Sequence, residues 1–503
     1  MGNRKSNAEK IQLDLNPTGN FWTDNGLVYL VNRFGQGVFS SKEILDYLVG
    51  ELLRETGNKG EYYDEVTGEV KEYDKVNWVY PTNYFIKSVD SAPKVKVKIE
   101  GKERKLPTFP PRPTLKLELT GRENCCHFCG KKSRVTKIKM WMFPFVVTQD
   151  KFSNFYSQGK GDIFLCPRCA LAGLAGYLTW LWVAQGKTLH FFLFYSNLEE
   201  LQVFHKEVIE DSQISGGKGG NVKLSFYGPY LHETTMALLL KLFSYVEGRG
   251  EEDQISQEGR ELLASLLGAQ EVAPVAPLTL YAVSGVLGQA FDMKSFQEFS
   301  RLHLPYRLYK AWKKELGEAR NPHRTVVNIF RQFQVREGNQ YNTLWRDKVC
   351  WAVLEFADPF PHIESFLFEG RAKEKSPLFW GTEEVFQHYA KEVLGVDENL
   401  LKVLRGFGYS LGKKTEEKKD MGLLYGLRNA KNVEEFLKIL NDIQFRLGIT
   451  IPEKLLELGQ GERIAGTPWL RVKTLLSIFA MNSYLRASSG NKEGGEEYEK
   501  SAE

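Results

Sequence analysis

Cys126-His127-Phe128-Cys129 and Cys166-Pro167-Arg168-Cys169 are the two stretches around which this sequence is organised. Each C-x2-C pair supplies two soft thiolate ligands from one tight turn, and two such pairs are typical of a tetrahedral zinc site. Residues 130–165 separate the pairs, more than the roughly 15–20 residues usual between them. The spacing therefore predicts a structural Zn²⁺ bound by Cys126, Cys129, Cys166 and Cys169, with an inserted segment between the two knuckles. Four thiolates leave no position for a catalytic water.

Two alternatives stay open at the cysteine pairs. Cys125 and His127 are further potential ligands at the first knuckle, and a relic site with reduced free thiols would have the same spacing. Cysteines clustered as metal-type pairs fit a reducing compartment, so we expect a cytoplasmic protein. The apolar run over 170–184 is shorter than the ~20 residues that span a bilayer. We interpret it as a buried helix beside the second knuckle, and expect no membrane partner.

Length and composition indicate several packed regions. At 503 residues, with 42% hydrophobic residues, the chain should form about three domains of roughly 150 residues. The predicted fold class is α+β: an N-terminal mixed α/β domain with the inserted four-cysteine zinc site, then a mainly helical C-terminal half that ends in a helical bundle. The predicted parts are an N-terminal α/β part at 1–120, the zinc-binding insertion at 121–170, the remainder of the α/β domain at 171–272, a helical linker region at 273–375, the C-terminal helical bundle at 376–490 and a disordered tail at 491–503.

Hydrophobic periodicity and turn residues predict individual elements. The sequence predicts a hairpin over 62–78 and a strand with one basic face through Val95, Val97 and Ile99. Asn432 and Gly448 have the residue types that begin and end a helix over 433–447. Further strands are expected over 134–147, 189–195 and 222–227. Further helices are expected from a cap at Thr23 or Asp24 to Val31 and over 198–209, 231–246, 256–267, 295–302, 306–316, 325–336 and 341–356, with a last one opened by Thr467-Pro468.

Familiar enzyme motifs fail at a required position. His232-Glu233-Thr234-Thr235-Met236 has Met where a metal-binding helix needs its second His. The glycines at 406, 408 and 412 miss the dinucleotide-binding spacing, and Gly217-Lys218-Gly219 lacks the hydroxyl of a phosphate loop. We therefore expect a protein that is not an enzyme. The alternatives are a zinc-containing nuclease or other nucleic-acid enzyme, and a zinc scaffold that binds proteins.

Basic residues gather locally, although the formal net charge is only +4. Lysines beside the first knuckle, two polar glycine-containing loops and a basic helical region with Tyr306, Tyr309 and Trp312 could hold phosphates and stack bases. Ordinary solvated surface is the alternative at each. The predicted nucleic-acid contacts are Lys131, Lys132, Arg134, Lys137, Lys139, Asn154, Gln158, Lys160, Lys218, Asn221, Lys310, Lys313, Lys314 and Arg324.

Two features together resemble a known family. They are Thr18-Gly19-Asn20-Phe21-Trp22-Thr23-Asp24-Asn25-Gly26 and the split cysteine pairs, followed by an apolar helix and a helical C-terminal half. This layout resembles the large subunit of type I CRISPR effector complexes (Cascade), in the I-A/I-B branch with a C-x-x-C…C-x-x-C region. The resemblance covers the layout of nearly the whole chain, but its specific motifs are these two alone.

The resemblance implies a non-catalytic, DNA-binding role. The family's large subunit recognises the short PAM in target duplex DNA, promotes strand separation and R-loop formation, and docks the helicase-nuclease. Guide pairing reads the long target, while protein reads the PAM. The implied partners are a crRNA-containing Cascade complex with its backbone and small subunits, target double-stranded DNA and the helicase-nuclease. No local motif aligns with the family's PAM-reading positions, so none is carried over.

Overall fold

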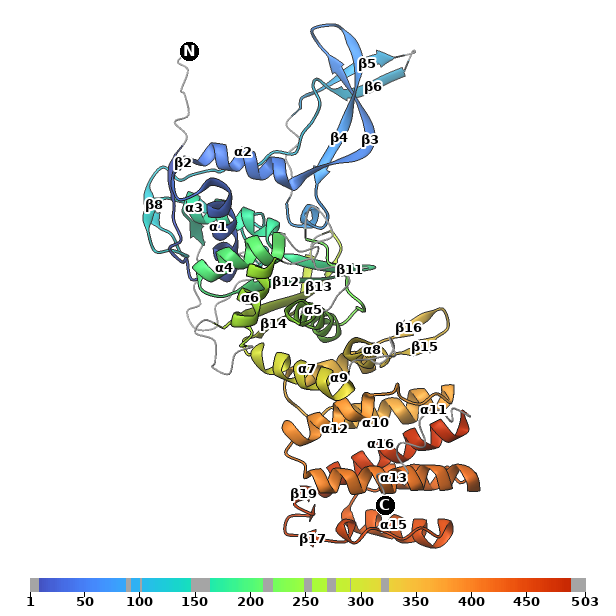
Figure 1. The fold of residues 1–503 in the computed structure, drawn as a ribbon. Helices are drawn as coiled ribbons and strands as arrows, with labels where there is room; N and C mark the ends of the chain where they lie inside the picture. Colours follow the sequence, from blue (N-terminus) through green and yellow to red (C-terminus); the bar gives the residue numbers. More distant parts are fainter. Residues whose placement is uncertain are drawn as a thin grey trace, which may run out of the picture. The chain divides into compact units, whose positions relative to one another are not determined.

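The computed structural model describes residues 9–86, 92–99, 102–145, 163–210, 220–247, 256–268, 277–289, 291–317 and 325–489, and it is a mixed α and β structure (Figure 1). Internal contacts divide the chain into two compact units. Unit 1 comprises Met1–Lys223 and Ser244–His303, and unit 2 comprises Leu224–Phe243 and Leu304–Glu503. The predicted tail at 491–503 lies outside the described residues.

An antiparallel four-stranded sheet forms the centre of unit 1. Its strand order is β11 (Leu181–Gln185), β12 (Thr188–Tyr195), β13 (Thr279–Leu287) and β14 (Phe291–Phe299). β12 is buried over almost its whole length, as its continuous apolar sequence predicts for a strand covered on both faces. The helix expected over 295–302 is wrong. Residues 291–299 pair along β13 instead, because the strand pairing overrides a weak local helix pattern.

Helices α1 (Phe21–Phe34) and α3 (Pro167–Ala175) cross closely in unit 1. A Cβ atom at Gly26 would lie 1.8 Å from the carbonyl oxygen of Ala172, so this crossing requires glycine. The Trp22 indole N–H donates to the Gly173 carbonyl at 2.7 Å. The apolar run expected as one helix over 170–184 is helical only in its first part, and continues into β11. The other helices of unit 1 are α2 (Ser41–Leu52), α4 (Leu198–Phe204) and α6 (Gln257–Leu266).

The Thr18–Gly26 stretch is accounted for by the start of α1. Asn20, and neither Thr23 nor Asp24, is the N-cap, since its side chain accepts the Thr23 N–H at 3.0 Å. The Thr18 N–H and hydroxyl both donate to Asp24 Oδ1 at 2.7 Å. Asp24 and Asn25 are fully buried. This stretch therefore fixes how α1 begins and packs.

Two long hairpins extend unit 1 beyond its sheet. β3 (Leu53–Asp64) pairs with β4 (Glu69–Trp78), and β5 (Lys94–Ile99) pairs with β6 (Lys102–Pro107). They lie side by side (Figure 1), joined by an ion pair between Glu61 and Arg104. They confirm the predicted hairpin over 62–78, although β3 begins earlier, at Leu53, and β5 confirms the predicted strand through residues 95–99. The smaller sheets pair β1 (Lys10–Leu13) with β2 (Gly37–Ser40), β7 (Glu123–Cys125) with β8 (Lys132–Arg134), and β9 (Thr136–Lys137) with β10 (Phe164–Leu165).

Two strands expected from apolar runs are wrong in most of their length. Within the described part of 134–147, the only strand residues are Arg134, at the end of β8, and the two residues of β9. Buried Trp141 and Met142 lie in a turn. Between 222 and 227, only Val222 has bridge structure, and it follows the parallel bridge of Asn221 with Trp182. Isolated aromatic residues pack from turns as well as from strands, so composition alone misassigned both segments.

Unit 2 is mostly helical around α16 (Trp469–Ser488), which is buried on nearly all sides and lies between α10 (Phe360–Ser365) and α13 (Glu398–Lys418) (Figure 1). Several of its buried polar residues have partners, as where Lys473 Nζ donates to the Arg428 carbonyl at 2.6 Å. A π-helical turn, Phe366–Arg371, separates α10 from α11. The other helices are α5 (Leu231–Val246, whose last turn belongs to unit 1), α7 (His303–Leu316), α8 (Val326–Arg331), α9 (Leu344–Leu354), α10 (Phe360–Ser365), α11 (Ala372–Glu374), α12 (Thr382–Glu392), α13 (Glu398–Lys418), α14 (Gly422–Asn429) and α15 (Val433–Leu447).

The helix ends that we predicted in unit 2 from capping residues are confirmed in one case and wrong in others. α15 confirms its prediction, with Asn432 accepting the Glu435 N–H at 2.8 Å and Gly448 at a φ of 66°. The expected helices over 325–336 and 341–356 are shorter, because the hairpin of β15 (Val335–Glu337) and β16 (Gln340–Asn342) separates them. The last helix begins only at Trp469, since Thr467 and Pro468 form β19 against β18 (Arg463–Ile464), which also pairs with β17 (Leu458–Gly459).

The glycines of α13 explain a motif that resembled a nucleotide loop. A Cβ atom at Gly412 would lie 2.2 Å from the Ala480 carbonyl oxygen, whereas one at Gly406 would meet nothing within 4 Å. We expect Gly412→Ala to lower the free energy of unfolding by about 1–3 kcal/mol through overpacking. Gly406→Ala is the matched control in the same helix, and should raise it by about 0.5–1 kcal/mol. Urea unfolding of both variants checks this, and equal effects would contradict it.

Candidate metal centre

Four cysteines meet in unit 1. The Sγ atoms of Cys126, Cys129, Cys166 and Cys169 all lie within 4.8 Å of one another, and Cys129 Sγ is 3.7 Å from Cys166 Sγ. Three of the four are buried, and Cys129 is partly exposed. The arrangement could hold a metal ion inside the fold.

The first knuckle is a tight turn between β7 and β8. The Gly130 N–H donates to the Cys126 carbonyl at 2.9 Å, and Gly130 has a φ of 71°, which suits glycine. Cys125 is exposed and does not belong to the cluster. His127 is also outside it, because its Nδ1 accepts the Phe164 N–H at 2.8 Å. Of the six potential ligands, the structure therefore brings together the four cysteine sulfurs of the two pairs and leaves out Cys125 and His127.

The second knuckle is the beginning of α3. Cys166 is the N-cap and accepts the Cys169 N–H at 3.5 Å, while Pro167 occupies the first helical position. The His127 N–H donates to the Phe164 carbonyl at 2.9 Å, which brings the two knuckles together. The cluster thus joins the first knuckle to the start of a fully buried helix.

Hydrogen bonds among the four thiols shift their pKa values in opposite directions. Hydrogen bonds from Cys166 and Cys169 lower the pKa of Cys126, and one from Cys169 lowers the pKa of Cys129 to about 6. The hydrogen bond with Cys126 raises the pKa of Cys166 to about 12, and it also raises the pKa of Cys169. Some of the thiols therefore retain protons that a divalent ion would displace.

Arg168 connects the second knuckle to the chain before α1. Its guanidinium is almost fully buried and donates to Asp14 Oδ1 at 2.6 Å and to the Asn16 carbonyl at 2.7 Å. Lys131, from the first knuckle, lies 3.7 Å from the other oxygen of Asp14. Both knuckles therefore contact the same carboxylate, which couples the cysteine cluster to the segment that leads into α1.

The basic segment beside the first knuckle is partly neutralised. Arg134 pairs with Glu9 at 3.2 Å, and Lys139 pairs with Glu118 at 2.9 Å. Lys132 and Lys137 are exposed. Exposed ion pairs contribute little and exchange partners readily. The segment is therefore less positive than its sequence indicates.

The remaining predicted contacts lie apart from the cluster. Lys310 and Lys314 are exposed on α7 in unit 2, Lys313 is partly exposed, and Asn221 is exposed in unit 1. We expected the aromatic rings of α7 to stack on bases. This prediction is wrong, because Tyr306, Tyr309 and Trp312 are all buried. Asn154, Gln158, Lys160, Lys218 and Arg324 lie outside the described residues.

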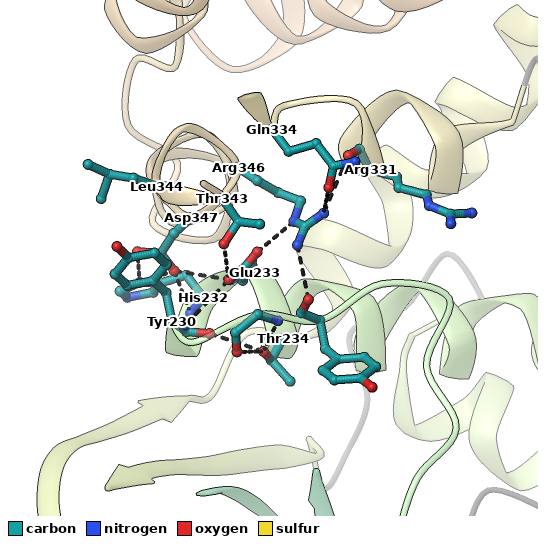
Figure 2. Close-up of polar contacts among 12 residues, drawn as sticks. Tyr230, His232, Glu233, Thr234, Arg331, Gln334, Thr343, Leu344, Arg346 and Asp347 are labelled. Atoms are coloured by element: carbon teal, nitrogen blue, oxygen red, sulfur yellow. Dashed lines mark hydrogen bonds and ion pairs between the residues drawn. The ribbon is translucent and has the colours of Figure 1, made fainter. Parts of the chain in front are cut away.

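The incomplete metal motif at His232-Glu233 has a structural role in unit 2. Figure 2 shows Glu233 between Thr343, whose hydroxyl donates at 2.8 Å, and Arg346, whose Nε donates at 2.5 Å. The His232 N–H donates to Asp347 Oδ1 at 2.9 Å. Glu233 and Arg346 are buried, so their carboxylate and guanidinium form an internal ion pair.

One basic surface was missing from our predicted contacts. On the β5–β6 ribbon, Lys96 lies directly opposite Lys105, and alternation places Lys94 and Lys98 on the same face. These lysines are exposed, and the face carries Glu103 as its single acid among the described residues. The alternating lysines were visible in the sequence, but only the cross-strand register adds Lys105 to them.

No protein-family model matches the chain, and no curated protein matches it in sequence. Among the described residues, no helix is long and apolar enough to cross a membrane.

Proposed function

We propose that this chain is the non-catalytic large subunit of a type I RNA-guided DNA interference complex. In this role it recognises the PAM in target duplex DNA, promotes strand separation and R-loop formation, and docks the helicase-nuclease in the cytoplasm. The proposal rests on the resemblance of the Thr18–Gly26 stretch and the cysteine pairs to that family. Its structural support comes from a surface suited to duplex DNA.

The basic face of the β5–β6 ribbon is the observation that best supports binding to duplex DNA. Its basic face has four lysines against one glutamate, a balance of +3, and the ribbon extends from the body of unit 1 (Figure 1). The major groove of B-DNA, about 12 Å wide, admits a two-stranded ribbon. Lysines on one face can contact phosphates while the ribbon enters the groove. The proposal therefore assigns the first contact with target DNA to this ribbon.

We propose Zn²⁺ as the ion of the cysteine cluster. Two sulfurs that each lie about 2.3 Å from one tetrahedral zinc are about 3.8 Å apart, and Cys129 Sγ and Cys166 Sγ are 3.7 Å apart. Thiolates select soft ions, and zinc is the common one in this geometry. With four sulfur ligands the ion would hold the knuckles against α3 and take no part in chemistry.

Binding to duplexes that differ only in the trinucleotide flanking the target tests the proposed function. The purified RNA-containing complex should prefer one flank by about tenfold or more, since one bidentate base contact discriminates by about 1–3 kcal/mol. Equal affinity for all flanks would contradict PAM reading. Metal-dependent cleavage of DNA by the isolated chain would instead support the nuclease alternative.

The ribbon makes a separate prediction about salt dependence. We expect Lys94→Ala/Lys98→Ala to weaken duplex binding, because each lysine that contacts a phosphate releases counterions. The slope of log K against log salt should become shallower by about 1.8 for two lost contacts. The control Lys187→Ala removes an exposed lysine from the β11–β12 turn of the same unit. A ribbon variant with the parent's slope would show that the ribbon does not contact DNA.

A further inference from the structure

Unit 2 contains a pocket of about 600 Å³, and its described lining includes none of the predicted nucleic-acid contacts. It lies where the end of α8, the β15–β16 hairpin, the π-helical turn and residues 379–380 meet. Its volume is within the range of about 300–1,000 Å³ typical of small-molecule sites. π-Helical turns are frequent at functional sites.

The lining of the pocket is positively charged. Three arginines, Arg331, Arg336 and Arg371, face one glutamate, Glu374, which gives a balance of +2. Glu374 pairs with Arg371 at 3.2 Å. Among the residues that the structure describes, Arg331 and Arg336 have no acidic partner, and Arg336 Nε donates to the Gly338 carbonyl at 3.2 Å. The Nε of buried Arg371 has no hydrogen-bond partner. The lining therefore attracts an anion, to which Arg331 and the remaining N–H groups of Arg336 can donate.

Aromatic and amide groups complete the lining. Phe379 is 42% exposed and Tyr341 is 59% exposed, and the Arg371 guanidinium lies 5.6 Å from the centre of the Phe379 ring. The Gln334 side-chain oxygen accepts a hydrogen bond from Arg346 at 3.0 Å. This contact fixes the oxygen and therefore sets the orientation of the amide N–H groups. Exposed rings can stack on a planar base, and amide N–H groups can donate to its edge.

Buried contacts fix the groups that line the pocket. Arg346 donates to the Arg331 carbonyl at 3.4 Å as well as to Gln334, as Figure 2 shows. On the other side, Arg371 donates to the Gln332 carbonyl at 3.3 Å, and the Phe379 N–H donates to Gln332 Oε1 at 2.8 Å. Residues from α8 and from 371–379 are thus joined through Gln332. A site held in this way loses little entropy when a ligand binds.

We propose that this pocket binds a nucleotide, with its phosphate on Arg331 and Arg336 and its base against Phe379 and Tyr341. The combination decides against a purely acidic ligand, which would use the arginines and leave the rings exposed. The nucleotide can be a unit of a single strand or a free mononucleotide, which share this chemistry. The inference stands on unit 2 alone and does not depend on recognition of duplex DNA by the β5–β6 ribbon.

The test uses the full chain and a short single-stranded oligonucleotide with one photoreactive 5-bromouridine. Crosslinking followed by peptide mapping should find the attachment within 331–380, and competition by AMP shows whether a free nucleotide also enters. An oligonucleotide of the same length with abasic sites separates phosphate binding from stacking. Loss of the bases should weaken binding at the pocket by about tenfold, because stacking on an aromatic side chain is worth about 1–3 kcal/mol per base.

Matched variants assign the effect to the pocket. Arg331→Ala/Arg336→Ala should abolish crosslinking at 331–380, and Phe379→Ala/Tyr341→Ala should remove the preference for the normal over the abasic strand. Lys431→Ala/Lys438→Ala removes two exposed cations elsewhere in unit 2 and should change neither. Thermal melting verifies that each variant is folded. Crosslinks that map outside 331–380, or that persist in the arginine variant, would overturn the proposal, even where duplex binding by the parent chain is intact.

Discussion

Replacing Cys126 and Cys129 by serine is expected to remove the bound metal ion and to unfold the region between the two knuckles. Cys126 is buried and contributes one of the four clustered sulfurs, so serine at both positions leaves only Cys166 and Cys169 as ligands. Metal binding and folding are coupled at such sites, with an apparent free energy of about 10–16 kcal/mol in zinc-finger peptides at pH 7. This is comparable with the whole stability of a typical domain, about 5–15 kcal/mol.

The structure indicates how far the damage should spread. α3 begins at the cluster and crosses α1 with almost no space between the helices, since Gly26 lies against Ala172. Loss of the ion therefore loosens the start of α3 and the core of unit 1. Unit 2 has its own core around α16 and should melt separately. Calorimetry should show a lower first transition, and mass spectrometry of the native protein should show the loss of one metal ion per chain.

Cys125→Ser is the matched control. Cys125 is the neighbour of Cys126, but it is exposed and lies outside the cluster. The control should keep the metal and the melting profile of the parent. A parent protein that contains no metal, or a Cys126→Ser/Cys129→Ser variant that melts like Cys125→Ser, would show that the cluster is a set of free thiols.

The sequence was sufficient to predict the cysteine cluster, because its four members come as two local pairs. The spacing of a C-x2-C turn by itself places two sulfurs close together, so only the contact between the two pairs remained to be inferred. The hairpin of β3 and β4 and the cap of α15 were predictable for the same reason: Gly68 and Asn432 act within a few residues. Recognition of the exact helix start failed at α1, where Asn20 caps in place of Thr23 or Asp24.

Features that depend on contacts distant in sequence were not predictable. β14 became a strand because β13 lies beside it, and its own residues favour a strand only weakly. The pocket in unit 2 requires Arg331 and Arg371 to meet across the chain, and no spacing rule joins them. The aromatic rings of α7 were assigned to a ligand because periodicity shows a shared face but does not show which face is buried. Tertiary contacts decide each of these cases.

The buried pair of Glu233 and Arg346 gives the second large effect. The Glu233 and Arg346 side chains are 0% and 3% exposed. We expect Glu233→Gln to lower the free energy of unfolding of unit 2 by about 3–5 kcal/mol, because it leaves a buried guanidinium without its counter-charge. Chemical denaturation followed through the tryptophan residues of unit 2 measures this change. Lys402→Met is the control: it breaks the exposed pair with Glu398 and should cost no more than about 0.5 kcal/mol.

Removing both charges should be less damaging than the two single changes suggest. In Glu233→Gln/Arg346→Met no buried charge is left unpaired, and the amide that replaces the Glu233 carboxylate retains a hydrogen-bond acceptor for the Thr343 hydroxyl. The loss of stability in the double variant should therefore be smaller than the sum of the two single losses. Additive losses, or a Glu233→Gln variant as stable as Lys402→Met, would contradict a buried ion pair.

The pH dependence of Arg346→Met tests the same pair from the side of the carboxylate. Burial raises the pKa of Glu233 even though Arg346 opposes the shift, so removal of Arg346 should raise this pKa further. A carboxyl group whose pKa is higher in the folded than in the unfolded state favours folding at low pH, and this contribution is lost as the pH rises through the folded pKa. Arg346→Met should therefore be closest to the parent in stability at low pH and fall behind it as the pH rises. A deficit that is constant with pH would show that Glu233 does not carry the charge that Arg346 balances.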